Sequence, residues 1–120
     1  MTAAVLAYEN TGKTLAQGRV AEALAFSKAA RLLEDARTHP GDAAKLREAL
    51  RVNGVVWTAV QAEITAARST LPRQLRAGLM SLSLFVDRVT EAARAGQGLD
   101  QIQALIDINR DVAAGLMETR

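Results

Sequence analysis

The stretch LREALRVNGVVWTAVQAEI, residues 46–64, decides the fold. Six of its side chains follow one another at alternating steps of four and three residues: Leu46, Leu50, Asn53, Trp57, Val60 and Ile64. This period places all of them on one face of an α-helix. All are apolar except Asn53, which is an amide. The stretch therefore predicts a helix that buries one face and sets an amide among the buried side chains.

A second stretch repeats this rhythm and predicts a facing helix: Leu75, Leu79, Leu82, Val86, Val89 and Ala93. Apolar residues make up 49% of the 120 residues but aromatic residues only 3%, so aliphatic side chains must form most of the core. The abundance of Ala, Leu, Glu, Arg and Gln favours helix, and the length suits four helices around one core. We predict an all-α protein, an antiparallel four-helix bundle preceded by a loose N-terminal arm.

Turn and capping residues set the predicted boundaries. We expect the arm over residues 1–13 and a single bundle domain over residues 14–120. A capping box at Thr14–Gln17 starts the first helix, which is predicted to reach Arg37. The later helices are predicted over residues 43–68, from the Pro72 region to Ala95, and from a second capping box at Asp100–Gln103 to about Gly115. Short loops between them make sequential helices antiparallel.

The composition argues against several functional classes. The chain has no cysteine, which excludes disulfides, thiolate metal sites and a cysteine nucleophile. His39 lies beside Pro40 and Gly41, where a turn residue is expected rather than a general base. Asp107 and Asp111 lie one turn apart without a third ligand, which is typical of a solvated face. We therefore expect no enzyme activity, no cofactor and no metal.

No stretch of the sequence has the length of a membrane span, and the N-terminus lacks the positive region of a signal peptide. We expect a cytoplasmic protein without membrane contact. The net charge of +2 is too small to predict nucleic-acid binding by itself. Two loose basic groups are present nonetheless: Lys45, Arg47 and Arg51, and Arg68, Arg73 and Arg76.

Two asparagines stand on apolar stripes, Asn53 and Asn109. Each can set the register of a bundle core or hydrogen-bond a bound peptide. Trp57, one turn from Asn53, is either a core residue or a binding hot spot. Gly78 and Ser81 form a shallow notch, with Phe85 one turn later. These alternatives stay open on residue chemistry alone.

Four blocks of the sequence, in order and spacing, resemble the FlaF family of bacterial flagellar biosynthesis regulators. They are Ala7-Tyr8, ALRVNGVVW at residues 49–57, LPRQLRA at residues 71–77 followed by Ser81, and Ile108-Asn109-Arg110 with Gly115-Leu116. The family pattern normally has an aromatic residue near Val86, and here Phe85 is its neighbour.

The resemblance implies a non-enzymatic protein that binds flagellin, as a secretion chaperone or as a regulator of flagellin production and filament assembly, alongside the regulator FlbT. Flagellin has long amphipathic terminal helices, which an apolar groove of a bundle can shield. The candidate partner-binding residues are Asn53, Trp57, Arg76, Gly78, Ser81, Phe85 and Asn109. Two alternatives remain: an RNA-binding post-transcriptional regulator of flagellin messenger RNA, which uses the basic groups, and a self-associating helical adaptor.

Overall fold

A computed structural model describes the backbone of residues 3–66 and 72–118 and the side chains of residues 20–66 and 72–117. The elements are α1 (Ala3–Thr38), α2 (Ala43–Thr65), α3 (Arg73–Arg94), the short 3₁₀ helix η1 (Leu99–Gln101) and α4 (Ile102–Glu118). No strand occurs in the described part of the chain. The predicted all-α four-helix bundle is confirmed.

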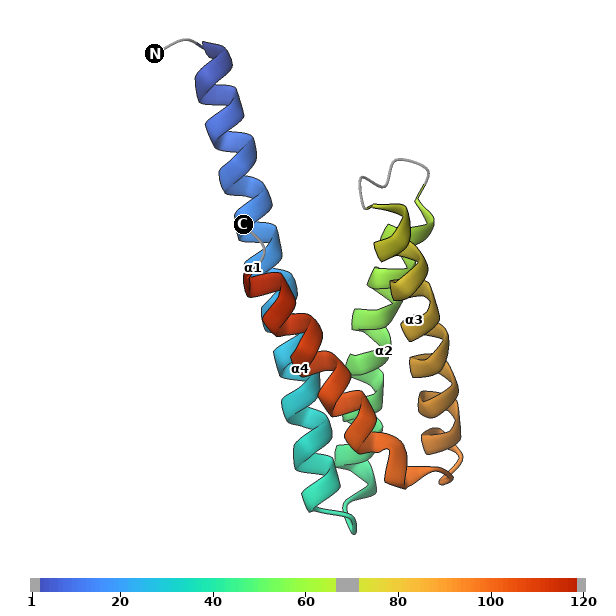
Figure 1. The fold of residues 1–120 in the computed structure, drawn as a ribbon. Coiled ribbons are helices and arrows are strands. Elements are labelled where there is room, and N and C mark those ends of the chain that lie inside the picture. Colours follow the sequence, from blue (N-terminus) through green and yellow to red (C-terminus); the bar gives the residue numbers. More distant parts are fainter. Residues whose placement is uncertain (1–2, 67–71, 119–120) are drawn as a thin grey trace.

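The four helices run alternately in opposite directions (Figure 1). α1 packs against both α4 and α2, and α2 packs on its other side against α3. α3 and α4 have fewer contacts, and the chain passes between them through η1. The molecule is elongated, with extents of 60 × 25 × 19 Å, because the N-terminal part of α1 projects past the other helices (Figure 1).

The predicted helix start at Thr14 is wrong. α1 begins at Ala3 and continues without a break through Glu9-Asn10-Thr11-Gly12, so the backbone of residues 3–13 is helical rather than an irregular arm. One glycine costs a helix only about 1 kcal/mol, and no proline lies in this stretch. Favourable residues on both sides therefore carry the helix through. The side chain of Tyr8, a residue of the predicted N-terminal arm, lies outside the described side chains.

The other helix boundaries follow the predictions to within a few residues. Asp42 caps α2, since its carboxylate accepts a hydrogen bond from the Lys45 backbone N–H at 3.2 Å. α2 ends at Thr65, three residues before the predicted Arg68. Pro72 directly precedes α3, as its missing N–H favours.

The predicted second capping box is wrong. Gln103 donates to Asp107 one turn ahead at 3.0 Å instead of reaching back to Asp100. The 3₁₀ helix η1 precedes α4 and follows Gly98, whose φ of 61° suits a residue without a Cβ. α4 ends at Glu118, three residues after Gly115 and close to the predicted end.

The core lies where α1, α2 and α4 meet. α1 presents mainly small side chains, Ala23, Ala29, Ala30 and Ala36, so neighbouring helices can approach it closely. The predicted stripe of α2 is largely buried, with Leu50, Asn53, Trp57 and Ile64 at 3% exposure or less. The stripe of α3 is buried at Val86, Val89 and Ala93 but becomes exposed toward the start of the helix, where Leu75 is 48% exposed. The bundle therefore leaves part of the apolar face of α3 uncovered.

Candidate functional site

A buried network joins three of the predicted site residues. The Trp57 indole Nε1 donates to Asn109 Oδ1 at 2.8 Å, and Asn109 Nδ2 donates to Asn53 Oδ1 at 2.7 Å. All three side chains are at most 1% exposed. Phe26 of α1 meets the Trp57 ring edge-on, with the ring centroids 5.6 Å apart. The network thus fastens α2 to α4 inside the core.

This arrangement supports the register-setting interpretation of the two asparagines. Each polar group on an apolar stripe finds a partner on the facing helix, as buried amides require. Asn53 Nδ2 is the exception, since it is buried without a hydrogen-bond partner in the described part of the chain. In the closed bundle, neither amide nor the indole reaches the surface where a partner could contact it.

Arg76 closes the α2–α3 hairpin. Its Nε and Nη2 donate to the backbone carbonyl of Ile64, at 3.2 and 3.0 Å. The Ile64 carbonyl is one of the last four carbonyls of α2. The carbonyls at the end of a helix have no backbone N–H one turn ahead to accept from, so they need other donors. Gln61 makes a second link across the hairpin, because its side-chain amide donates to the hydroxyl of buried Ser83 and, at 2.9 Å, to Asp87. Gln61 has no local sequence signal of this role, since its partners lie on another helix.

Gly78, Ser81 and Phe85 lie together on the outward side of α3, away from the network. Gly78 and Ser81 are exposed and Phe85 is half-buried. The Arg88 guanidinium lies 6.0 Å from the centroid of the Phe85 ring. We refer to the residues Leu75, Gly78, Ser81, Leu82 and Phe85 as the α3 surface. The structure therefore separates the seven predicted site residues into three groups. Asn53, Trp57 and Asn109 form the buried network, Arg76 links α3 to the end of α2, and Gly78, Ser81 and Phe85 belong to the α3 surface.

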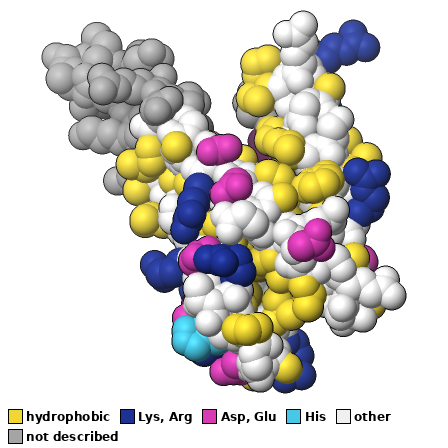
Figure 2. Space-filling view, turned by 60° about the horizontal axis from the view of Figure 1, so that its bottom comes forward, with side chains coloured by type: hydrophobic (Ala, Val, Ile, Leu, Met, Phe, Trp, Pro, Cys, Tyr) yellow, Lys and Arg dark blue, Asp and Glu magenta, His cyan; other side chains and the backbone are white. Residues whose placement is uncertain are grey.

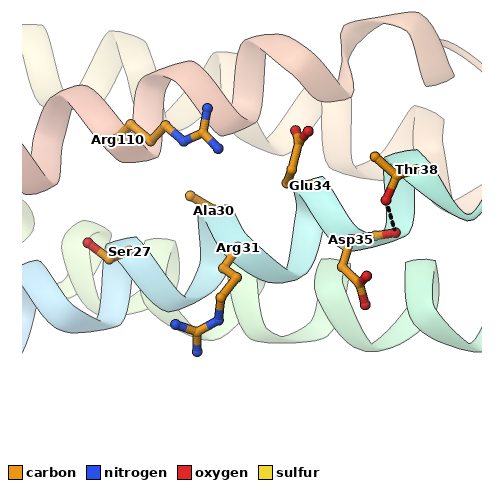
Figure 3. A pocket seen from close by; sticks show the side chains of 7 residues that line it. All are labelled: Ser27, Ala30, Arg31, Glu34, Asp35, Thr38 and Arg110. Atoms are coloured by element: carbon orange, nitrogen blue, oxygen red, sulfur yellow. Dashed lines mark hydrogen bonds between the residues drawn. The ribbon is translucent and has the colours of Figure 1, made fainter.

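A groove of about 440 Å³ runs between α1 and α4 and was not predicted (Figure 3). We call it the α1–α4 groove, and its lining residues are Ser27, Ala30, Arg31, Glu34, Asp35, Thr38 and Arg110. Arg110 extends from α4 along the groove, whereas the Arg31 guanidinium points away from α4 (Figure 3). No local sequence pattern marks this groove, because its lining residues come from two helices that are far apart in the sequence.

Both carboxylates of the groove form ion pairs with basic side chains that do not line it. Arg37 pairs with Glu34 at 2.6 Å, and this hydrogen bond lowers the pKa of Glu34. Lys45 pairs with Asp35 at 2.7 Å and lowers the pKa of Asp35 in the same way. Arg31 and Arg110, in contrast, have no ion pair within 4.0 Å in the described part of the chain.

The chain matches the family model described as flagellar protein FlaF over residues 4–116. It belongs to the FlaF family. No curated protein and no solved structure gives a significant match. The match reaches from the second residue of α1 almost to the end of α4, so it includes the whole Trp57–Asn109–Asn53 network. The FlaF-family assignment places the protein in the flagellar system.

Intramolecular contacts engage much of the basic charge of this FlaF-family protein. Lys45 pairs with Asp35, Arg51 pairs with Glu48 at 2.7 Å, and Arg76 binds the Ile64 carbonyl. Arg47 and Arg73 are exposed, and Arg68 lies outside the described residues. Of the six basic side chains that the sequence grouped, Arg47 and Arg73 are therefore the two without an ion pair within the described residues.

Neither a metal cluster nor a membrane-spanning segment is found in the described parts of the chain. No three His, Cys, Asp or Glu side chains there come close enough together to hold a metal ion. The described helices are also too polar or too short to cross a bilayer. His39 takes part in the turn after α1, where its Nδ1 lies 2.8 Å from the Asp35 carbonyl oxygen and 3.2 Å from the Thr38 hydroxyl.

Proposed function

We propose that this protein binds flagellin and acts as its secretion chaperone, and thereby regulates flagellin production and filament assembly. Membership of a flagellar family supports this proposal, as does an all-helical fold with uncovered apolar side chains. A bundle of this kind can hold an amphipathic helix by its apolar face, as other helix-in-groove proteins do. The long terminal helices of flagellin are suitable partners.

The α3 surface carries the proposal. Leu75 is 48% exposed, and Leu82 and Phe85 are half-buried, so an apolar strip lies open along α3. Gly78 lies in the same strip, and a Cβ added there would meet no atom within 4 Å. A partner helix can therefore approach the α3 backbone closely at Gly78 and pack against Phe85.

The buried network supports this surface from within. Hydrogen bonds among Trp57, Asn53 and Asn109 fix α2 against α4. The hydrogen bonds of Arg76 to the Ile64 carbonyl fix α3 against α2. A rigid frame reduces the entropy that must be lost when a partner binds. We therefore assign Trp57, Asn53, Asn109 and Arg76 a supporting role and Gly78, Ser81 and Phe85 a contact role.

The test is a calorimetric titration of the purified protein with flagellin monomer at physiological salt. The control ligand is flagellin trimmed of both terminal helices. We expect heat of binding with the intact monomer and none with the trimmed one. Absence of binding to intact flagellin would overturn the proposal and favour the messenger RNA leader, or a complex that needs FlbT, as the target.

Gly78→Leu tests the α3 surface itself. The added side chain points into open space, so the fold tolerates it, but it fills the position that a partner helix would approach. We expect flagellin binding to weaken about tenfold. Ala59→Leu is the matched control, because Ala59 is exposed on α2 and lies about 160° around that helix from Gln61, whose side chain faces α3. Equal binding by both variants would remove the α3 surface from the proposal.

A further inference from the structure

We propose that the partner helix lies between α3 and α4 rather than on α3 alone, so that α4 forms the second wall of the binding site. The inference rests on the proposed function, and its occupant is an amphipathic terminal helix of flagellin. It adds Val112 and Leu116 of α4 to the contact residues on α3.

The buried stripe of α3 loses its cover toward the start of the helix. Val86 and Val89 are at most 2% exposed. Leu82 and Leu79, one and two turns before Val86, are half-buried, and Leu75 is 48% exposed. These side chains follow one another at steps of three and four residues, so they lie on one face of the helix. Leu75 and Leu82 of the α3 surface therefore continue the face that the core covers further along α3.

α4 shows the same change toward its C-terminal end. Leu105 is 1% exposed, whereas Val112 and Leu116, seven and eleven residues later, are half-buried. Seven and eleven residues are about two and three turns, so the three side chains share one face of α4. Leu105 belongs to the same core cluster as Val89 of α3, and Val112 and Leu116 pack against the edge of this cluster. The core is therefore open along this part of α4.

The two uncovered faces border the same opening, because α3 and α4 diverge. η1 joins the end of α3 to the start of α4, and the two helices separate from there (Figure 1). Both faces become more exposed in this direction, away from η1. Figure 2 shows a notch between the grey N-terminal atoms and the lobe that α2 and α3 form, with hydrophobic side chains on the inner side of that lobe. Exposed apolar side chains that cluster mark an interaction site.

An amphipathic helix fits this opening. The uncovered stripe of α3 is continuous with the stripe that packs against the other helices of the bundle, so it suits the same kind of partner. From Leu75 to Phe85, α3 rises about 15 Å, which corresponds to about three turns of a bound helix. Because this helix contacts α3 on one side and α4 on the other, it needs a wide apolar face, with apolar residues at i, i+3, i+4 and i+7. The amphipathic terminal helices of flagellin are of this kind.

The experiment uses single cysteines that carry a benzophenone photocrosslinker, because the chain has no cysteine of its own. Leu75→Cys places the label on the α3 wall, and Leu116→Cys places it on the α4 wall. Leu84→Cys is the control on α3, because Leu84 is 54% exposed and lies nine residues from Leu75, on the opposite side of the helix. Ala114→Cys is the control on α4, because Ala114 is exposed and lies about 160° around the helix from Leu116.

Each labelled variant is first titrated with intact flagellin monomer and then irradiated in the complex. We expect the labels at Leu75→Cys and Leu116→Cys to crosslink to the same terminal helix of flagellin. The two control labels are expected to give no crosslink to it. Loss of binding through the label at Leu116→Cys alone, with an unchanged urea midpoint, would support the second wall equally.

Amide hydrogen exchange of the unaltered protein tests the same point without any substitution. We expect flagellin to slow exchange about tenfold both in the first turns of α3 and in the last turns of α4. Slower exchange in α3 with no change in α4 would overturn the inference.

These results separate the inference from the proposed function. If the unaltered protein does not bind flagellin, the proposed function fails. If it binds and the label at Leu75→Cys crosslinks but the label at Leu116→Cys does not, α4 is not a wall, and the proposed function stands on the α3 surface. Crosslinks of equal yield from the control labels would overturn the assignment to the opening between α3 and α4.

Discussion

Asn109 connects the two halves of the buried network, since it accepts from the Trp57 indole and donates to Asn53. Asn53 makes one of these bonds only, and its own Nδ2 has no partner within the described residues. The two asparagines are therefore unequal, although both stand on apolar stripes of the sequence. Their substitution is expected to show this difference.

Asn109→Ala is expected to destabilise the fold more than Asn53→Ala. The first change leaves Trp57 Nε1 and Asn53 Oδ1 unpaired in the core, at about 1–3 kcal/mol for each group. The second leaves Asn109 Nδ2 unpaired but removes the unpaired Nδ2 of Asn53, so the two effects partly cancel. Urea denaturation followed by the fluorescence of Trp57, the sole tryptophan, measures both free energies of unfolding. A larger loss for Asn53→Ala would contradict the assigned network.

The sequence predicted the burial of these residues but not their bonding. A period of alternating four and three residues is a local property, so it identified Asn53, Trp57 and Asn109 as stripe positions. Their hydrogen bonds join residues 52 and 56 apart in sequence, and such pairings depend on how the helices pack. Choosing between core and contact roles therefore required the structure.

At the scale of the elements, hydrogen bonds at the helix ends link neighbouring helices. α2 ends near Thr65, and its Ile64 carbonyl would lack a partner without Arg76 on the next helix. Arg76 belongs to one of the family-like blocks of the sequence, but no local pattern predicts this hydrogen bond, because its acceptor lies on the preceding helix. Similarly, local turn residues suggested a late start for α1, whereas the summed helix propensity of residues 3–13 carries the helix through.

Arg76→Met is expected to loosen the end of α2. Methionine keeps much of the apolar stem but donates no hydrogen bond, so the Ile64 carbonyl loses both guanidinium contacts. We expect a loss of about 1–2 kcal/mol in unfolding free energy and faster amide hydrogen exchange in the last turn of α2. Arg73→Met, at an exposed position one turn earlier, is the control. Unchanged exchange in Arg76→Met would show that these hydrogen bonds do not hold this end.

At the scale of the whole molecule, short loops and apolar stripes were enough to predict the antiparallel bundle. They could not predict that α1 packs more extensively on α4 than on its sequence neighbour α2, because that contact joins the two ends of the chain. The α1–α4 groove is a consequence of this packing, which is why sequence reasoning missed it. α1 and α2 are also joined at the surface, through the ion pair of Asp35 with Lys45.

This ion pair makes part of the stability of the bundle depend on pH. Lys45 hydrogen-bonds Asp35 at 2.7 Å and lowers the pKa of that carboxyl, and His39 lies 3.3 Å away. Because the folded pKa lies below the unfolded value of about 3.9, the stabilisation is complete above that value and is lost as the pH falls through the folded pKa.

Asp35→Asn is therefore expected to be less stable than the unaltered protein at pH 7 and to match it at a pH well below the folded pKa of Asp35. The difference is expected to be small, since both side chains of the pair are more than one third exposed. Urea unfolding across an acid pH series measures it, with Asp111→Asn as an exposed control on α4. A stability difference that stays constant across the series would show that Asp35 acts through packing rather than through its charge.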